Sequence, residues 1–157
     1  NSREIKELNV VSSGDFIVAS PLNIIKLEIN MAGSGNILLK KEVTGNKLEI
    51  NLASSGSVVA SDINLKDVEC SLAGSGFIQV GGNAEKAEYN LAASGNIKAY
   101  DCLTNKVECN IAGSGNIQAY AKNHLEANIV GSGNVYYKGN PTTSKSVIGS
   151  GKLKDAN

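Results

Sequence analysis

The chain has 157 residues, and its 15 Lys and Arg balance its 15 Asp and Glu, so its formal net charge is zero. A zero net charge gives no bulk attraction to nucleic acid or to an acidic membrane surface. Arg3 is the single arginine, which argues against bidentate recognition of phosphate or carboxylate groups. No apolar run approaches the roughly eighteen residues of a membrane-spanning helix, so we expect no such helix.

The chain opens with Asn-Ser-Arg and has neither an initiator methionine nor the basic and apolar segments of a secretory leader. We therefore expect either that a leader has been removed or that the chain is a fragment. Residues 1–157 are interpreted as one domain.

From residue 10 onward, a short Gly-Ser-Gly motif or a close variant returns about every twenty residues. The copies are VVSSGDF (10–16), MAGSGNI (31–37), LASSGSV (52–58), LAGSGFI (72–78), LAASGNI (91–97), IAGSGNI (111–117), IVGSGNV (129–135) and VIGSGKL (147–153). We call the last glycine of each copy the marker glycine; the eight are Gly14, Gly35, Gly56, Gly76, Gly95, Gly115, Gly133 and Gly151. A fixed period of this length predicts a solenoid, in which each repeat is one coil that covers the apolar face of the next.

Apolar residues stand at every second position on both sides of each marker glycine. Leu27, Ile29 and Met31 precede the second marker in this way, and Ile37 and Leu39 follow it. The same positions are apolar in most of the other repeats. A period of two predicts one strand before each marker and another after it, each with one buried face. No segment has the 3.6-residue period of a helix.

Two strands joined by a glycine corner, together with a short variable stretch, would make one coil. The fold class predicted is therefore an all-β, right-handed, single-stranded parallel β-helix of about seven coils. A leucine-rich repeat has a similar period, but its Leu-x-x-Leu-x-Leu pattern and helical return are missing from the sequence. A propeller blade would need about forty residues or more.

The Ser-Gly pair at each corner has a structural explanation. We expect the marker glycines to supply backbone angles that other residues avoid, and the serine hydroxyls to bond to the turn backbone. The corner residues singled out are Gly35, Gly56, Gly76, Gly95, Gly115 and Gly133, with Ser34, Ser75 and Ser114. A phosphate loop or a nucleophilic serine is disfavoured, because a catalytic serine is singular and needs a base, and the only histidine is His124.

Three polar columns alternate with the buried positions before each marker. The glutamate column contains Glu7, Glu28, Glu49, Glu69, Glu88, Glu108 and Glu126. Two residues earlier stand Lys26, Lys47, Asp67, Lys86, Lys106 and His124. Two residues later stand Asn9, Asn30, Asn51, Ser71, Asn90, Asn110 and Asn128. We expect an outward surface on which lysines offset the glutamates and asparagine amides bond from coil to coil.

Two other interpretations of the polar columns stay open. The repeating face could bind a repeating polymer such as a glycan. The glutamate column could hold a cation, although calcium needs six to eight oxygens around one point, which a flat column does not provide.

The reactive side chains do not form a set that is typical of an active site. Cys70 and Cys109 share one column two coils apart, about 9–10 Å, which is too far for a disulfide. With Cys102 elsewhere in its coil, we expect three reduced thiols that act as small apolar residues. The five aspartates are scattered, and no acid pair suited to glycoside hydrolysis stands out. We expect no catalytic residues, no metal site and no cofactor.

Tyrosines gather on one outward face near the end of the chain. Tyr100 and Tyr120 both lie five residues after their marker glycines, so we expect them to stack on adjacent coils, with Tyr136 as a diagonal neighbour. Lys98, Gln118 and Lys138 share this face, so these six residues form the candidate binding face, where rings could stack on sugars. The alternative is an aromatic ladder that only stabilises the sheet.

The repeats Ala-Gly-Ser-Gly-Asn-Ile, and the ending from Val135 to Pro141 followed by the corner at Ser150 and Gly151, resemble the head GIN domain family of auto-transporter adhesins, typical of Bacteroidetes. The resemblance covers nearly the whole chain. It implies a β-helical fold, export to the periplasm, outer-membrane surface or medium, often as a lipoprotein, and no catalytic residues to carry over. Family members usually have further coils before the point where this chain starts.

Together these observations predict a non-enzymatic, exported binding or adhesion module of the cell envelope. Its partner would be a polysaccharide or another cell-surface protein, and not nucleic acid. The alternative is a structural protein that self-associates through its ends or side faces. Such pairing is discouraged at the C-terminal coil by the charges of Lys152, Lys154 and Asp155. The N-terminal end, with Ile5 and Leu8, has no such charges. An inactive relative of a polysaccharide lyase would instead show a groove lined with carboxylates and lysines.

Overall fold

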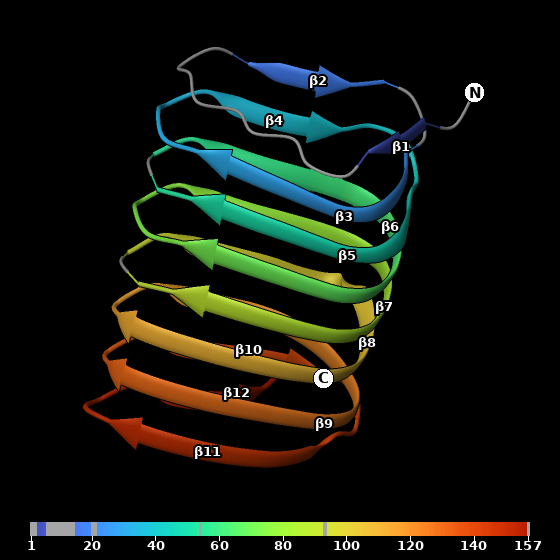
Figure 1. Ribbon diagram of the computed structural model, residues 1–157. Helices are drawn as coiled ribbons and strands as arrows, with labels where there is room; N and C mark the ends of the chain where they lie inside the picture. Colours follow the sequence, from blue (N-terminus) through green and yellow to red (C-terminus); the bar gives the residue numbers. More distant parts are fainter. Residues whose placement is uncertain (1–2, 6–14, 20–21, 54, 93, 157) are drawn as a thin grey trace.

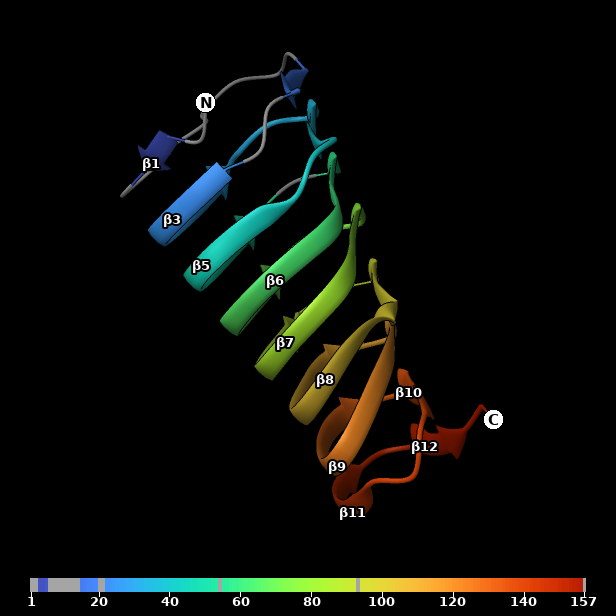
Figure 2. The ribbon, with the colours of Figure 1, turned by 90° about the vertical axis from the view of Figure 1, so that its right-hand side faces the viewer.

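The protein is a parallel β-solenoid of about seven turns, as the sequence predicts (Figure 1). The computed structural model describes residues 3–5, 15–19, 22–53, 55–92 and 94–156. Within these ranges every regular element is a strand, and all pairings between strands are parallel. The coils lie one above another along a single axis (Figure 2).

The strands form two walls, which meet at the Ser-Gly corners. Their bounds are β1 (Arg3–Ile5), β2 (Phe16–Val18), β3 (Leu22–Met31), β4 (Asn36–Leu39), β5 (Val43–Leu52), β6 (Ser57–Leu72), β7 (Phe77–Leu91), β8 (Asn96–Gly113), β9 (Asn116–Gly131), β10 (Asn134–Lys138), β11 (Thr142–Ile148) and β12 (Lys152–Asp155). The first wall holds β1, β3, β5 and β11 and the later halves of β6 to β9. The second wall holds β2, β4, β10 and β12 and the first halves of β6 to β9.

The four central strands differ from the expected pair of strands per coil. Each of β6, β7, β8 and β9 runs without a break from one Ser-Gly corner to the next, through the variable stretch. The surplus residues are absorbed where the pairing register shifts, for example between Ala60 and Ile63 and between Ala99 and Leu103. Bulges of this kind let coils of unequal length keep their hydrogen-bond ladder.

The predicted apolar columns form the core. Every described residue four, six or eight positions before a marker glycine from Gly35 to Gly133 is buried. The positions two and four residues after the markers are buried in the coils from Ile37 to Ala119, and Val135 is buried as well. In the end coils Phe16, Val18, Tyr137 and Leu153 pack partly exposed against the core, and Asp155 is exposed. Leu8 and Val10 lie outside the described residues.

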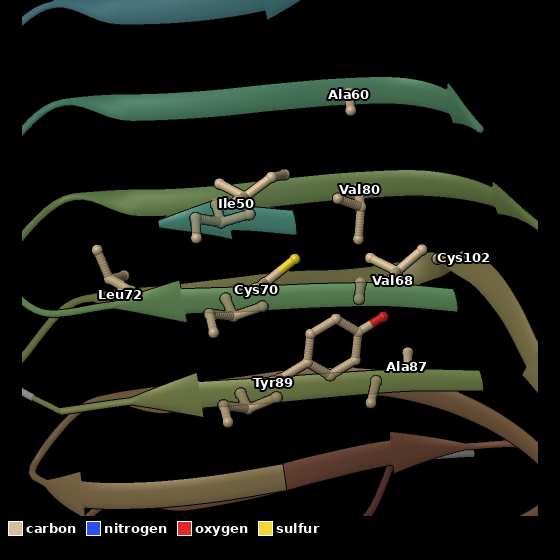
Figure 3. Close-up of a cluster of buried hydrophobic side chains, with 14 of the residues drawn as sticks. Ile50, Ala60, Val68, Cys70, Leu72, Val80, Ala87, Tyr89 and Cys102 are labelled. Atoms are coloured by element: carbon tan, nitrogen blue, oxygen red, sulfur yellow. The ribbon is translucent and has the colours of Figure 1, made fainter. Parts of the chain in front are cut away.

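Among the described residues Tyr89 is the largest fully buried side chain, and it lies among small residues of its own and of neighbouring columns (Figure 3). Cys70, Ala87 and Cys102 surround its ring. All three cysteines are buried and unbridged, as predicted. Burial raises the pKa of the Cys70 and Cys109 thiols, so both stay protonated.

The marker glycines form one column at the corner, as predicted, with Gly14 outside the described residues. A Cβ atom on Gly76 would lie 1.8 Å from the carbonyl oxygen of Gly56, and one on Gly56 would lie 1.9 Å from that of Gly35. Gly95 and Gly133 meet the same obstacle at 2.3 and 2.2 Å. At these positions the residue must be glycine, because the backbone of the preceding coil occupies the space of a side chain.

The expected conformational reason for the marker glycines is wrong. No marker glycine among the described residues has a positive φ angle. In the last three corners the positive φ belongs to the first glycine of the Gly-Ser-Gly triplet, for example 140° at Gly113 and 125° at Gly131. The serine directly before each described marker glycine is exposed.

Candidate functional site

The predicted binding residues lie on the outward side of the second wall. Strand pairing places Lys98, Gln118, Tyr136 and Lys154 in one row across β8, β9, β10 and β12. Tyr120 pairs with Lys138 on the next strand. The three tyrosines of the prediction are half-buried. The structure thus brings the six predicted residues together on consecutive coils.

Tyr100 and Tyr120 are not paired, which corrects the expected stacking. The ladder between β8 and β9 pairs Ala99 with Ala119 and then resumes with Leu103 opposite Tyr120. Tyr100, Asp101 and Cys102 are the surplus residues of this bulge. Tyr120 therefore lies beside Leu103, whose side chain is 37% exposed.

Tyr100 belongs instead to a cluster with Lys138 and Tyr136. The Lys138 ammonium nitrogen lies 4.7 Å from the centroid of the Tyr100 ring. Partial burial, and then the neighbouring Tyr136, raise the pKa of the Tyr100 phenol. The phenol is therefore neutral near neutral pH and is available as a hydrogen-bond donor.

Two further lysines lie over aromatic rings of a preceding coil. The Lys98 nitrogen is 5.3 Å from the centroid of Phe77, and that of Lys154 is 5.6 Å from the centroid of Tyr136. Each contact of this kind contributes about 0.5–1 kcal/mol at an exposed site. We call this surface the aromatic–lysine face; it consists of Phe77, Lys98, Tyr100, Gln118, Tyr120, Tyr136, Lys138 and Lys154.

Phe77 and Lys154 were missed by the sequence analysis. The available signal was their spacing, because Phe77 is one residue and Lys98 three residues after consecutive markers, which makes them diagonal neighbours on adjacent strands. A lysine ammonium group lies over the rings of Phe77, Tyr100 and Tyr136, whereas no described lysine lies over the ring of Tyr120.

The first wall carries the predicted glutamate column, with its described members half-buried and in register from Glu28 to Glu126. Lys26 pairs with Glu49 of the next coil at 3.7 Å, and Lys47 pairs with Glu69 at 3.6 Å. No further ion pair is formed between described residues beyond Asp67, which interrupts the lysine column. The expected pairing of lysines with the glutamate column is therefore confirmed only at Glu49 and Glu69.

In the lower part of the glutamate column the carboxyls act on one another and form no ion pair between described residues. Burial, and then the Glu88 and Glu126 carboxyls above and below, raise the pKa of Glu108. Around it lies an open hollow of about 190 Å³, lined by Lys47, Asp67, Val68, Glu69, Lys86, Glu88 and Glu108. It has the mixed lysine and carboxylate lining expected for a lyase relative, but it is smaller than the roughly 300–1,000 Å³ of typical ligand pockets.

Asparagine ladders join the coils on both walls. On the first wall Asn51 donates to Asn30 at 2.8 Å, and Asn110 donates to Asn90 at 2.8 Å, which confirms the predicted amide ladder. A second ladder, missed from the sequence, follows the corners on the second wall. There the Asn116 side-chain oxygen accepts from the backbone N–H of Asn134 at 3.1 Å. Its signal was the Asn that directly follows four of the eight marker glycines, at Asn36, Asn96, Asn116 and Asn134.

The described part of the chain holds no group of three or more His, Cys, Asp and Glu side chains placed to bind a metal ion. His124 lies half-buried in the lysine column, in register with Lys106. Across the same residues there is also no helix of the length and apolar character needed to cross a membrane.

These features define a parallel β-solenoid whose candidate surface lies on its outward columns rather than in an enclosed cavity. The chain belongs to the family named putative auto-transporter adhesin, head GIN domain, which it matches over residues 33–141. This finding confirms the resemblance seen in the repeats.

Crystal structures of similar proteins come from Bacteroidetes. A putative lipid binding protein of Parabacteroides distasonis is 53% identical, with a TM-score of 0.94, and the match covers 96% of this chain and 61% of that one. A putative adhesin of the same species is 31% identical, with a TM-score of 0.94 and coverage of 97% and 64%. A putative adhesin of Parabacteroides merdae is 35% identical, with a TM-score of 0.91 and coverage of 97% and 64%.

The chain thus spans less than two thirds of the length of these relatives. A comparison with curated proteins gives no match.

Proposed function

We propose that the protein is a non-enzymatic, exported binding module of the cell envelope, which holds an extended glycan along its aromatic–lysine face. The observation that carries this proposal is the gathering of Tyr100, Tyr120 and Tyr136, three of the five tyrosines, on one outward face. The name of the family and of two relatives, adhesin, supports a binding role.

The shape of the face favours a polymer over a small ligand. Its rows repeat once per coil, about every 4.8 Å, and it is a wall of the solenoid rather than an enclosed pocket. Tyr120 offers the ring that no described lysine covers, and the exposed Leu103 lies beside it. A sugar ring could therefore stack on Tyr120 while its hydroxyls bond to Gln118 and Lys138.

The same repetition argues against an enzyme. Catalysis needs a singular set of groups with different roles, whereas the serine, asparagine and glutamate columns present the same group in nearly every coil. The adhesin family name agrees with a module that binds without converting its partner.

The test is Tyr120→Ser, with Tyr120→Phe as the matched control. A glycan array with the purified domain first selects a ligand, and a titration then measures its affinity for each variant. We expect Tyr120→Ser to weaken binding at least tenfold, and Tyr120→Phe to retain most of the affinity because it keeps the ring. Loss of the ring contacts should cost only about 0.5–1.5 kcal/mol of stability. If no glycan binds, or if only the melting temperature changes, the face is a stabilising ladder and the proposal fails.

A second candidate is contact with a lipid. Ile17, Leu38 and Val59 form an outward apolar row across β2, β4 and β6, and the Ile17 side chain is 57% exposed. The name of one relative, a putative lipid binding protein, supports this second candidate. Cosedimentation with phospholipid vesicles, compared between the wild type and Val59→Lys, would separate this role from glycan binding.

A further inference from the structure

We propose that the glycan held by the aromatic–lysine face is acidic, with carboxylate or sulfate groups that pair with Lys98, Lys138 and Lys154. This inference rests on the proposed function and names the class of its ligand. It follows from the way in which the three ammonium groups are held.

Each of the three lysines is positioned by an aromatic ring and not by a carboxylate. Their nitrogens lie 4.7 to 5.6 Å from the ring centroids of Phe77, Tyr100 and Tyr136. Both ion pairs found between described residues are on the other wall, at Lys26 and Lys47. The three ammonium groups are therefore held by rings and form no ion pair with a described carboxylate; the exposed Asp101 and Asp155 lie on the same wall.

The spacing of the lysines suits a chain that runs along the solenoid axis. Lys98 and Lys154 occupy the same row three coils apart, which corresponds to about 14 Å. Lys138 lies on β10, between the coils of the other two. Lys138 is two residues further along its strand than that row, so the three cations form a staggered set across consecutive coils. Such a set matches a polymer that carries repeated negative charge, whereas a single anionic group would meet only one of them.

Hydrogen-bonding groups for sugar hydroxyls lie directly beside these lysines. Asn96, Asn116 and Asn134 are in register two residues before the lysine row. The side-chain oxygens of Asn116 and Asn134 accept backbone N–H groups of the next coil, at 3.1 and 3.0 Å. Their amide NH₂ groups can then serve as donors to a ligand.

The layout of charge favours a ligand that stays on one face over one that surrounds the solenoid. The cations of this face are all lysines, which bind carboxylate, sulfate and phosphate groups alike as point charges. The glutamate column on the other wall would repel a polyanion that wraps around the solenoid. The ligand should therefore stay on one face.

The experiment compares probes that differ in charge only. Fluorescently labelled dextran and dextran sulfate share one backbone, and polygalacturonate tests carboxylates in place of sulfates. The variants are a triple change, Lys98→Gln, Lys138→Gln and Lys154→Gln, and a control triple change of equal charge, Lys66→Gln, Lys86→Gln and Lys106→Gln. The control lysines are exposed and lie on the first wall.

We expect dextran sulfate, polygalacturonate or both to bind the wild type, with affinity that falls as salt is raised. The first triple variant should lose at least tenfold in affinity, and the control should stay within about twofold. Equal losses in both variants would show attraction by net charge alone and would overturn the inference. Equally tight binding of duplex DNA, lost in the same triple variant, would overturn the assignment to a glycan.

The outcomes also separate this inference from the proposed function. If dextran or a neutral array glycan binds as tightly as its acidic counterpart, and Tyr120→Ser abolishes that binding, the face binds glycans but the acidic class is wrong. If no acidic or neutral glycan binds, both the inference and the proposed function fail.

Discussion

Replacement of Gly76 by alanine tests the physical basis of the whole repeat. The added Cβ atom would lie 1.8 Å from the carbonyl oxygen of Gly56, whereas real Cβ atoms essentially never come closer than 3.0 Å. The two coils must therefore move apart locally by about 1.2 Å. That oxygen also accepts the backbone N–H of Phe77 at 3.3 Å, so the movement would break the hydrogen bond that restarts the ladder after the corner.

The expected cost follows from these two effects. Overpacking of this kind costs about 1–3 kcal/mol, and a buried carbonyl without its donor costs about 1–3 kcal/mol more. The lower entropy of the unfolded alanine chain offsets about 0.4–1 kcal/mol. We expect a net loss of about 2–4 kcal/mol in the free energy of unfolding, which corresponds to a fall in melting temperature on the order of 10 °C for a domain of this size.

The loss of stability is measured by thermal melts followed by circular dichroism, with two control substitutions for comparison. In Gly81→Ala the Cβ atom would be 2.8 Å from the Ser61 carbonyl oxygen, so a shift of about 0.2 Å suffices and the cost should stay below about 1 kcal/mol. Ser75→Ala changes an exposed side chain of the same corner and should be within about 0.5 kcal/mol of the wild type. A Gly76→Ala protein as stable as Gly81→Ala would refute the argument from close approach.

Two other predictions concern the polar columns. Asn110→Ala removes hydrogen bonds to Asn90 and from Asn128, and should lower the free energy of unfolding by about 1–2 kcal/mol in a denaturant titration; Ser71→Asn fills the gap in the ladder and should raise it by about 0.5–1 kcal/mol. The pKa of Glu108 in the folded state is raised above its ordinary value of 4.5. Its contribution to the free energy of unfolding is therefore fully present below pH 4.5, where the carboxyl is protonated, and is lost as the pH rises through the folded-state pKa. Glu108→Gln should therefore raise the melting temperature at pH 7 and have no such effect near pH 3; an equal gain at both pH values would contradict this origin.

The sequence was sufficient for the architecture of the solenoid because the alternation of apolar residues fixes which side of each strand is buried. The alignment on the marker glycines also gave the register, and the pairs of Glu28 with Glu49 and of Asn30 with Asn51 are those of the structure. What it did not give was the reason for the markers. Close approach of two backbones, as at Gly56 and Gly76, involves residues about twenty positions apart and leaves no trace in local propensity.

The candidate site was predicted less well, because it depends on the variable part of the coil. Counting from the markers placed Tyr100 opposite Tyr120, but the bulge between Ala99 and Leu103 displaces the pairing by three residues. Sequence spacing shows that a coil has surplus residues, and it does not show where they leave the ladder. The contact of Lys138 with the ring of Tyr100 depends on that displacement and on side-chain directions, so it needed the structure.

The distribution of charge over the two walls changes what a net charge of zero means for this protein. The balance of 15 against 15 excludes bulk attraction to a polyanion, but the negative column from Glu28 to Glu126 and the row from Lys98 to Lys154 lie on different walls with the apolar core between them. Stacked sheets are about 10 Å apart, and outward side chains add to that separation, whereas the Debye length at physiological ionic strength is about 8 Å. A ligand on the aromatic–lysine face is therefore largely screened from the glutamates and meets a locally cationic surface. Additional glutamates on the first wall should leave the affinity for this ligand almost unchanged. Removal of Lys98, Lys138 or Lys154 should weaken binding.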